Sequence, residues 1–360
     1  MTKTIASHGG NLARAAREYG IEEKDFIDFS ASINPLGPSP GVFRAITEEL
    51  WRIRHYPDPE CGRLPEMLAR HLGVEKGNIV LGNGGAELIY ILPAALKIKR
   101  ALVAAPTFSE YAEAVTASGG EVEYFAYGRD IKEIIEYLPG KDAVFICNPN
   151  NPTGRVIDRA SLIAVVDAAE KSGAFAVVDE AFMDFVEDRE VISVMGEACS
   201  RSRLVVLYSM TKFFGIPGLR LGAAVANAEI TRLLKKSKDP WSVNTLAAVA
   251  GEAALKDKRH MEETLKVVRE ERLHLQHGLS SLPGVRPYQS AANFLLVDIS
   301  ETRLTPAEMV ERLGRMGVLV RNCSNFTGLD VPCIRVAVRN RDENNTLINA
   351  IKKASQGTVL

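Results

Sequence analysis

The segment SMTKFFGIPGLRLG, residues 209–222, holds the residues best suited to covalent chemistry. An apolar strand is predicted to end at Tyr208, and Lys212 follows it in a loop rich in glycine and apolar side chains. Because apolar surroundings disfavour the ammonium form of a lysine, they lower its pKa and suit it to joining a carbonyl compound. Ser209 and Arg220 flank this lysine and could bind one phosphate together. A solvated surface lysine is the commoner case, but the flanking serine, arginine and glycines favour a covalent role.

A second candidate, Asp179, follows the apolar run AFAVV in the segment AFAVVDEAFMDF. A carboxylate at the end of a buried strand is costly unless it is paired, and the cationic ring nitrogen of a bound cofactor would supply a partner. An aspartate that caps a turn is the alternative interpretation. The neighbouring Glu180 and Asp184 are predicted to be structural or solvated.

Two further segments follow predicted strands and are rich in turn-forming residues. In CNPNNPTG, residues 147–154, Asn151 precedes a proline and is therefore held extended, which can direct its amide toward a ligand. A plain turn is the better interpretation of this stretch by itself. In LGNGGAELI, residues 81–89, backbone N–H groups at the start of a helix can bind phosphate, although the glycine spacing is not that of nucleotide-binding loops.

These segments are positioned by an alternation of predicted strands and helices. The expected strands of the central region lie at 78–81, 101–104, 143–147, 174–178, 204–208 and 222–225, with an amphipathic helix at 158–172. Such alternation predicts an α/β fold with a mostly parallel sheet between helices, whose ligands gather at the carboxyl ends of the strands. We assign this large domain to residues 46–255.

The two ends of the chain are predicted to form a smaller α+β domain. The N-terminal segment 1–45 is expected to join the C-terminal region 256–360. In that region we expect helices at 261–282 and 306–316, strands at 293–298, 318–321 and 334–338, and a last helix.

The composition argues against several classes of function. The chain has 360 residues and a formal net charge of −1, so no overall field attracts it to nucleic acid or to an anionic membrane. Its five cysteines are widely separated and form no CxxC pair, which argues against a disulfide framework or a metal site and suits a reducing compartment. With no apolar run of about 18 residues and no leader-like N-terminus, the expected location is the cytoplasm.

Taken in order, the motifs GNGGAE, PTFSEY, NPNNPTG, DEAF, SMTKFFGIPGLRLG and RVAV resemble those of fold-type I enzymes that use pyridoxal 5′-phosphate (PLP), the aspartate aminotransferase superfamily. The resemblance covers nearly the whole chain and implies PLP as the cofactor. It implies that Lys212 forms a Schiff base with PLP and then carries protons, and that Asp179 pairs with the pyridinium nitrogen. The other PLP contacts that it implies are Asn151 to the ring hydroxyl, Phe108 stacked on the ring, and Gly85, Ala86, Ser209 and Arg220 at the phosphate.

The same resemblance implies a shared active site. Tyr56, in RHYPDPEC, matches a tyrosine that reaches the cofactor phosphate of the neighbouring subunit, so a homodimer is expected. Arg335 matches the arginine that binds the substrate carboxylate.

Within the superfamily the chain is most similar to histidinol-phosphate aminotransferases and to the L-threonine-O-3-phosphate decarboxylases of cobalamin synthesis. The segments HGGN, DFSASINPLGPS and RNCSNFTGL resemble the decarboxylases and favour a small phosphorylated amino acid as the substrate. A phosphate dianion needs local cations, because the net charge provides none. The expected substrate-binding residues are His8, Asn34, Asn151, Arg321, Ser324, Asn325 and Arg335.

Two alternatives to the decarboxylase stay open. One is a histidinol-phosphate aminotransferase, although Phe182 stands where aminotransferases usually carry a tyrosine that bonds the ring oxygen. The two reactions break different bonds at the substrate Cα, which residue types alone do not distinguish. The other is a PLP-binding transcriptional regulator, the least favoured reading, because the N-terminal segment shows no recognition helix with a basic stripe.

Overall fold

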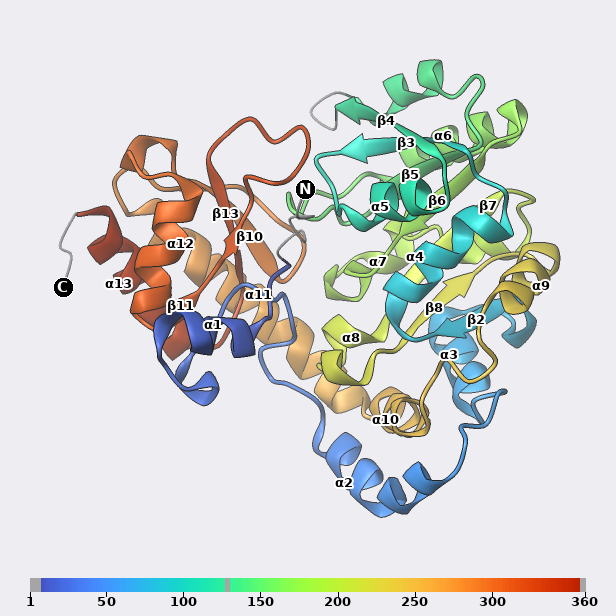
Figure 1. The fold of residues 1–360 in the computed structure, drawn as a ribbon, viewed down its shortest axis with the longest axis horizontal. Helices are drawn as coiled ribbons and strands as arrows, with labels where there is room; N and C mark the ends of the chain where they lie inside the picture. The colour runs from blue at the N-terminus through green and yellow to red at the C-terminus, as the bar shows by residue number, and fades with distance from the viewer. Residues whose placement is uncertain (1–7, 127–129, 357–360) are drawn as a thin grey trace.

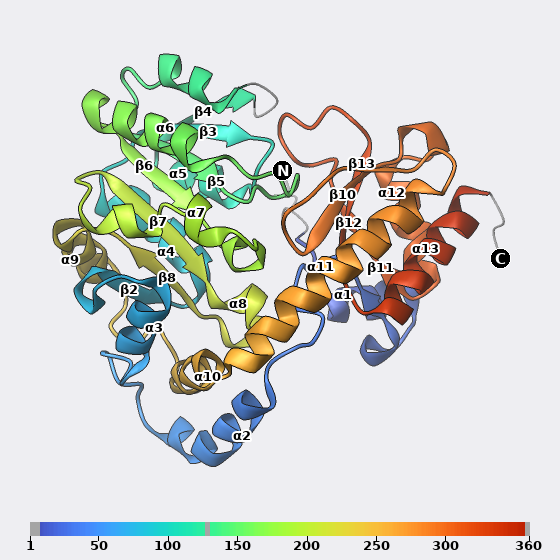
Figure 2. The same cartoon turned by 180° about the vertical axis from the view of Figure 1, so that it is seen from behind.

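The protein folds into two lobes, and the long helix α11 (Lys258–Ser280) runs from the larger lobe into the smaller one (Figures 1 and 2). This computed structural model describes residues 8–126 and 130–356. Residues 1–7 lie outside the described ranges, so the prediction made for the N-terminus concerns residues that are partly not described. No helix in the described ranges is long and apolar enough to cross a membrane.

The larger lobe is built around a seven-stranded sheet with the order β2-β8-β7-β6-β5-β3-β4. The neighbours from β7 to β4 pair in parallel, whereas β8 is antiparallel to both β2 and β7. The strands are β2 (Ile79–Gly82), β3 (Arg100–Ala105), β4 (Glu121–Ala126), β5 (Ala143–Cys147), β6 (Phe175–Asp179), β7 (Leu204–Ser209) and β8 (Gly222–Val225). The predicted α/β fold with a mostly parallel sheet is confirmed.

Each face of this sheet carries its own hydrophobic core, because successive side chains of a strand point to opposite faces. In β5, Val144 and Ile146 enter one core, and Phe145 and Cys147 enter the other. The first core is covered by α3 (Leu64–Leu72), α6 (Arg159–Ser172) and α10 (Thr245–Lys256), and the second by α4 (Gly84–Ala95), α5 (Glu110–Ala117) and α9 (Ala228–Ser237). Two short helices, α7 (Arg189–Ile192) and α8 (Met210–Phe213), lie in connections.

The smaller lobe combines a four-stranded antiparallel sheet with helices. Its strand order is β12-β13-β10-β9, with β9 (Arg286–Pro287), β10 (Phe294–Asp298), β12 (Arg321–Asn322) and β13 (Cys333–Ala337). The helix α12 (Pro306–Arg315) packs on it, α13 (Arg341–Ser355) packs against α11 and α12, and α1 (Leu12–Tyr19) lies beside α12. The N-terminal segment joins this lobe through a parallel pair of short strands, β1 (Ile27–Asp28) and β11 (Val318–Leu319).

Two predicted boundaries differ from the structure. The expected limit between residues 45 and 46 falls inside α2 (Pro40–Glu49), which packs against α10 of the larger lobe. The chain therefore enters that lobe before α2. The single strand expected at 318–321 is divided between β11, which pairs with β1, and β12, which pairs with β13.

Candidate active site

Polar residues that follow three adjacent parallel strands meet at one edge of the large sheet. Asn151 follows β5, Asp179 ends β6, and Lys212 follows β7 on α8. The register places Cys147 of β5 and Leu207 of β7 on either side of Asp179. All three polar residues line one cavity of about 370 Å³ between the lobes, at the edge where parallel sheets bind ligands.

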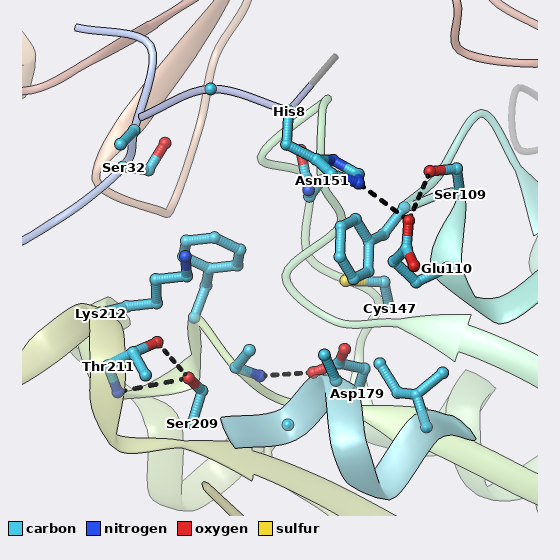
Figure 3. Close-up of a pocket in the computed structure, with 18 of the residues that line it drawn as sticks. His8, Ser32, Ser109, Glu110, Cys147, Asn151, Asp179, Ser209, Thr211 and Lys212 are labelled. Carbon is cyan, nitrogen blue, oxygen red and sulfur yellow. Dashed lines mark hydrogen bonds and ion pairs between the residues drawn. The ribbon is translucent and has the colours of Figure 1, made fainter. Parts of the chain in front are cut away.

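Lys212 points into this cavity (Figure 3). The pKa of its amine is lowered from 10.5 to about 8, first by burial and then by the positive charges of Arg335 and Arg220, while the charge of Asp179 opposes the shift. A larger fraction of neutral amine is therefore present near neutral pH than for a solvated lysine. That is the condition for attack on a carbonyl carbon.

Asp179 is a buried carboxylate on the floor of the cavity. Its Oδ1 accepts the backbone N–H of Ala181 at 2.9 Å, and its Oδ2 accepts the hydroxyl of Tyr111 at 2.6 Å. Burial raises the pKa of this carboxyl group, while the two hydrogen bonds and the charge of Lys212 lower it. The balance favours a cationic group in the cavity as a further partner. Sequence reasoning missed Tyr111.

Gly84, the first residue of α4, lies against the Arg220 side chain at the edge of the cavity. Gly84 has a φ of +79°, and a Cβ at this position would stand 2.7 Å from Nη2 of Arg220, so the approach needs glycine. Gly85, Ala86 and Arg220 line the cavity. Backbone N–H groups of a helix start beside a guanidinium form a suitable site for a phosphate.

The same end of the cavity contains two hydroxyl groups. Ser209 Oγ lies 2.7 Å from Thr211 Oγ1, and both side chains line the cavity (Figure 3). The predicted phosphate contacts Gly85, Ala86, Ser209 and Arg220 are thus brought together, and Thr211 is an addition to them.

An aromatic wall is formed by Phe108, whose ring lies 5.7 Å from the ring of His8. His8 Nε2 is 2.9 Å from Glu110 Oε1, so a hydrogen bond between the N-terminal segment and α5 closes this side of the cavity (Figure 3). The segment also lies close to Ser30, and this approach needs the glycine next to His8. A Cβ on Gly9 would stand 2.1 Å from the carbonyl oxygen of Ser30.

The opposite wall carries two buried arginines from the small lobe. Arg321 of β12 and Arg335 of β13 are direct cross-strand partners, and both line the cavity. Arg335 donates hydrogen bonds to Asn151 Oδ1 and to the carbonyl oxygen of Ser30, while its buried Nε has no partner among the described residues. Burial and the charge of Arg321 help to lower the pKa of Arg335 to about 10. Arg321 donates to Asn325 Oδ1 at 2.8 Å.

Three predicted site residues do not line the cavity. Asn34 is buried elsewhere, where its amide donates to the Phe213 carbonyl oxygen and to Thr264. Ser324 is exposed. Its hydroxyl donates to Asn322 Oδ1 within a short turn. Tyr56 is 82% exposed, and its ring lies 5.2 Å from that of Trp241.

The structure adds one candidate from the motif that contains Asn34. Ser32 is buried and lines the cavity, and its Oγ has no hydrogen-bond partner among the described residues. No feature of the sequence distinguishes Ser32 from Ser30, whose hydroxyl donates to Asp28.

The residues present fit PLP on the chemistry of the cavity alone. A buried carboxylate that favours a cation, a lysine of lowered pKa, an aromatic wall and a phosphate-binding helix start surround one space. Asn151 offers its amide nitrogen as a donor, because its oxygen already accepts from Arg335. Phe182 lines the same space, with its ring 5.0 Å from that of Phe294.

Comparisons with known proteins agree with this geometry. The model of the family described as aminotransferase class I and II matches residues 24–351. A threonine-phosphate decarboxylase of Salmonella typhimurium is 37% identical over 360 residues, covering 98% of this chain and 97% of that protein. A histidinol-phosphate aminotransferase of Moorella thermoacetica is 35% identical over 356 residues, covering 96% and 89%. The solved histidinol-phosphate aminotransferase of Sinorhizobium meliloti in complex with PLP shares the fold, with a TM-score of 0.88 at 21% identity over 98% of this chain and 96% of that one.

Proposed function

The chain belongs to the class I and II aminotransferase family and is a PLP-dependent enzyme, and on this premise we propose that it decarboxylates L-threonine O-3-phosphate. The products are (R)-1-amino-2-propanol O-2-phosphate and carbon dioxide. The cytoplasmic location expected from the sequence is part of the same proposal.

The observation that carries the proposal is the pair Arg321 and Arg335. Two guanidinium groups occupy opposite positions on adjacent strands, both buried and both facing one cavity. Guanidinium groups bind carboxylates and phosphates through paired N–H donors, so this placement suits a ligand with two anionic groups. A substrate that carries a carboxylate and a phosphate would bring an anion to each arginine at the same time. Threonine phosphate is such a molecule, and it is small.

The roles of the chain's own residues follow from their positions. When bound, PLP supplies an aldehyde that reacts with amines and a ring that withdraws electrons from the bonds at the substrate Cα. Lys212 has a lowered pKa, so more of its amine is neutral than in a solvated lysine, and it can hold and return a proton at Nζ. Asp179 stabilises positive charge at the ring nitrogen. Arg335 and Arg321 orient the carboxylate and the phosphate, and the Ser32 hydroxyl is free to donate to one of them.

A histidinol-phosphate aminotransferase is the second candidate, favoured by the similarity of the Moorella protein. Arg321 and Asn325 would serve the phosphate of that substrate equally well. Phe182 argues against it, because its ring packs on Phe294 and offers no hydroxyl to a ring oxygen.

The proposal includes a homodimer. Tyr56 follows a stretch with exposed large apolar side chains on α2 and the turn after it, including Phe43, Trp51 and Ile53, which are 60–67% exposed, and its ring lies 5.2 Å from that of Trp241. Exposed large apolar residues of this kind are typical of a subunit interface. An interface there would let Tyr56 reach the site of a second copy.

The test is a pair of assays on the purified holoenzyme. Threonine phosphate should release carbon dioxide and form the amino alcohol phosphate in equal amounts. Histidinol phosphate with 2-oxoglutarate should give no glutamate. If glutamate forms and no carbon dioxide is released, the decarboxylase proposal is wrong and the second candidate replaces it.

A further inference from the structure

The side chain of Tyr111 connects two parts of the candidate site. It is the second residue of α5 and is 1% exposed. Its hydroxyl donates to Asp179 Oδ2 at 2.6 Å, and the other carboxylate oxygen accepts the Ala181 N–H at 2.9 Å. With a donor on each oxygen, the carboxylate cannot rotate without losing one of the two bonds.

The ring of Tyr111 also supports the aromatic wall. It stacks on Phe145 of β5, with ring centroids 5.7 Å apart and an interplanar angle of 19°. The ring also contacts Phe108, at 5.7 Å and 82°, an edge-to-face arrangement. A shift of Tyr111 would therefore disturb both Phe108 and Asp179.

The phenol is held in the form that donates. Burial, followed by the charge of Asp179, raises the pKa of Tyr111 well above 10, so its proton is retained at physiological pH. Among the effects that counter the burial of Asp179, the Tyr111 hydrogen bond comes first. A hydrogen bond to the ionised form favours that form.

We propose that Tyr111 is a positioning residue for the cofactor, fixing the orientation and charge of Asp179 toward the pyridine nitrogen and bracing Phe108 against the ring. This inference rests on the role of Asp179 in the proposed function. Tyr111 itself acts through Asp179 and Phe108.

The perturbation is Tyr111→Phe, which keeps the ring and removes the donor. Without that donor Asp179 becomes more basic and leaves less positive charge on the cofactor ring, and the nitrogen joined to Lys212 then becomes more basic. The pH midpoint of the visible colour change of the holoenzyme should rise. The kcat should fall about tenfold to a hundredfold, the range for one hydrogen bond to a charged group, with little change in KM. Tyr124→Phe, on β4 and exposed, is the matched control and should change neither quantity.

A double-mutant cycle separates this role from simple packing. In an Asp179→Asn background, Tyr111→Phe should have much less effect on kcat, because the two residues act as a unit. Incorporation of 3-fluorotyrosine at position 111 strengthens the donor without changing the fold and should lower the colour midpoint. This variant carries the test if Tyr111→Phe folds poorly.

Four outcomes would overturn the proposal. A colour midpoint equal to wild type in both Tyr111 variants would show that Tyr111 only packs, even if stability falls. Additive losses of kcat in the cycle would show that it does not act through Asp179. An Asp179→Asn enzyme with wild-type colour and kcat would remove the assigned role of Asp179, and the Tyr111 inference with it. If Asp179→Asn loses its activity while Tyr111→Phe keeps the wild-type kcat and colour midpoint, the Tyr111 inference is refuted and the role of Asp179 stands.

Discussion

Replacing Arg321 with alanine tests the assignment of the substrate phosphate. The Arg321 side chain is buried, donates to Asn325 Oδ1 at 2.8 Å, and lies 5.2 Å from the centroid of the Phe326 ring. Removing one partner of a buried charge pair costs about 2–5 kcal/mol. The lower end applies, because Arg335 stands directly opposite and its pKa is lowered by the charge of Arg321. A loss of about 2 kcal/mol corresponds to a dissociation constant raised about thirtyfold.

The assay is a titration of the holoenzyme with threonine phosphate, followed by the absorbance of the cofactor, beside steady-state measurement of the amine product. Unphosphorylated threonine is the internal control and should bind about equally to wild type and Arg321→Ala. Arg315→Ala, an exposed arginine of α12 paired with Glu311, controls for loss of charge in the small lobe. Arg321→Lys should recover only part of the affinity, because an ammonium group lacks the planar fork.

Equal weakening of threonine phosphate and threonine would refute the reasoning. Arg321 would then maintain the wall of the cavity, and the phosphate would bind elsewhere.

Four further predictions follow from the site. In Lys212→Ala, borohydride should fix no PLP to the protein and turnover should be lost; wild-type turnover would contradict the covalent role. The pKa of Lys212 is lowered, chiefly by burial, from 10.5 to about 8. Between these two pH values the unfolded chain binds more protons than the folded one, so the free energy of unfolding of the apoprotein should rise with pH. Thermal unfolding of wild type should show this rise and Lys212→Ala should lack it; parallel pH dependences of the two unfolding temperatures would contradict the prediction. Ser32→Ala should raise the KM for threonine phosphate about threefold to tenfold, the range for one neutral hydrogen bond, without lowering the unfolding temperature, while Ser324→Ala should leave KM unchanged; equal effects would remove Ser32 from the site. Sedimentation should show a dimer, and Tyr56→Ala should weaken PLP binding without dissociating the dimer. A fully active monomer would contradict the shared site.

Most of the residues that line the cavity at the sheet edge could be predicted, because strand ends and motif types carry that information. The strands at 143–147 and 222–225 have the predicted bounds, since each is a continuous apolar run in a sheet covered on both faces. The family and the cofactor are confirmed. Strand β4 was missed because it lies at the edge of the sheet and only Phe125 among its residues is buried.

The residues proposed to bind the substrate were harder to predict, because their contacts join distant parts of the chain. Asn34 shares a motif with Ser32, yet its amide is used by Phe213 and Thr264, far away in sequence. Nothing in the local pattern reveals that competition. Glu180 and Asp184 are both buried and hydrogen-bonded, the former to Ser193 and the latter to Tyr208, so the structural alternative holds for both.

The placement of Arg321 on a hairpin of the small lobe, away from the sheet that holds the cofactor residues, has a consequence for how such enzymes diverge. Under the proposed roles, drift along residues 321–326 would alter which anion is accepted and would affect Asn151 and Lys212 indirectly, through Arg335. Arg335 lacks this freedom, because it also bonds Asn151 and lowers the pKa of Lys212. Laboratory selection for new substrates should therefore begin at Arg321, Asn325 and Ser32, and keep Arg335 constant.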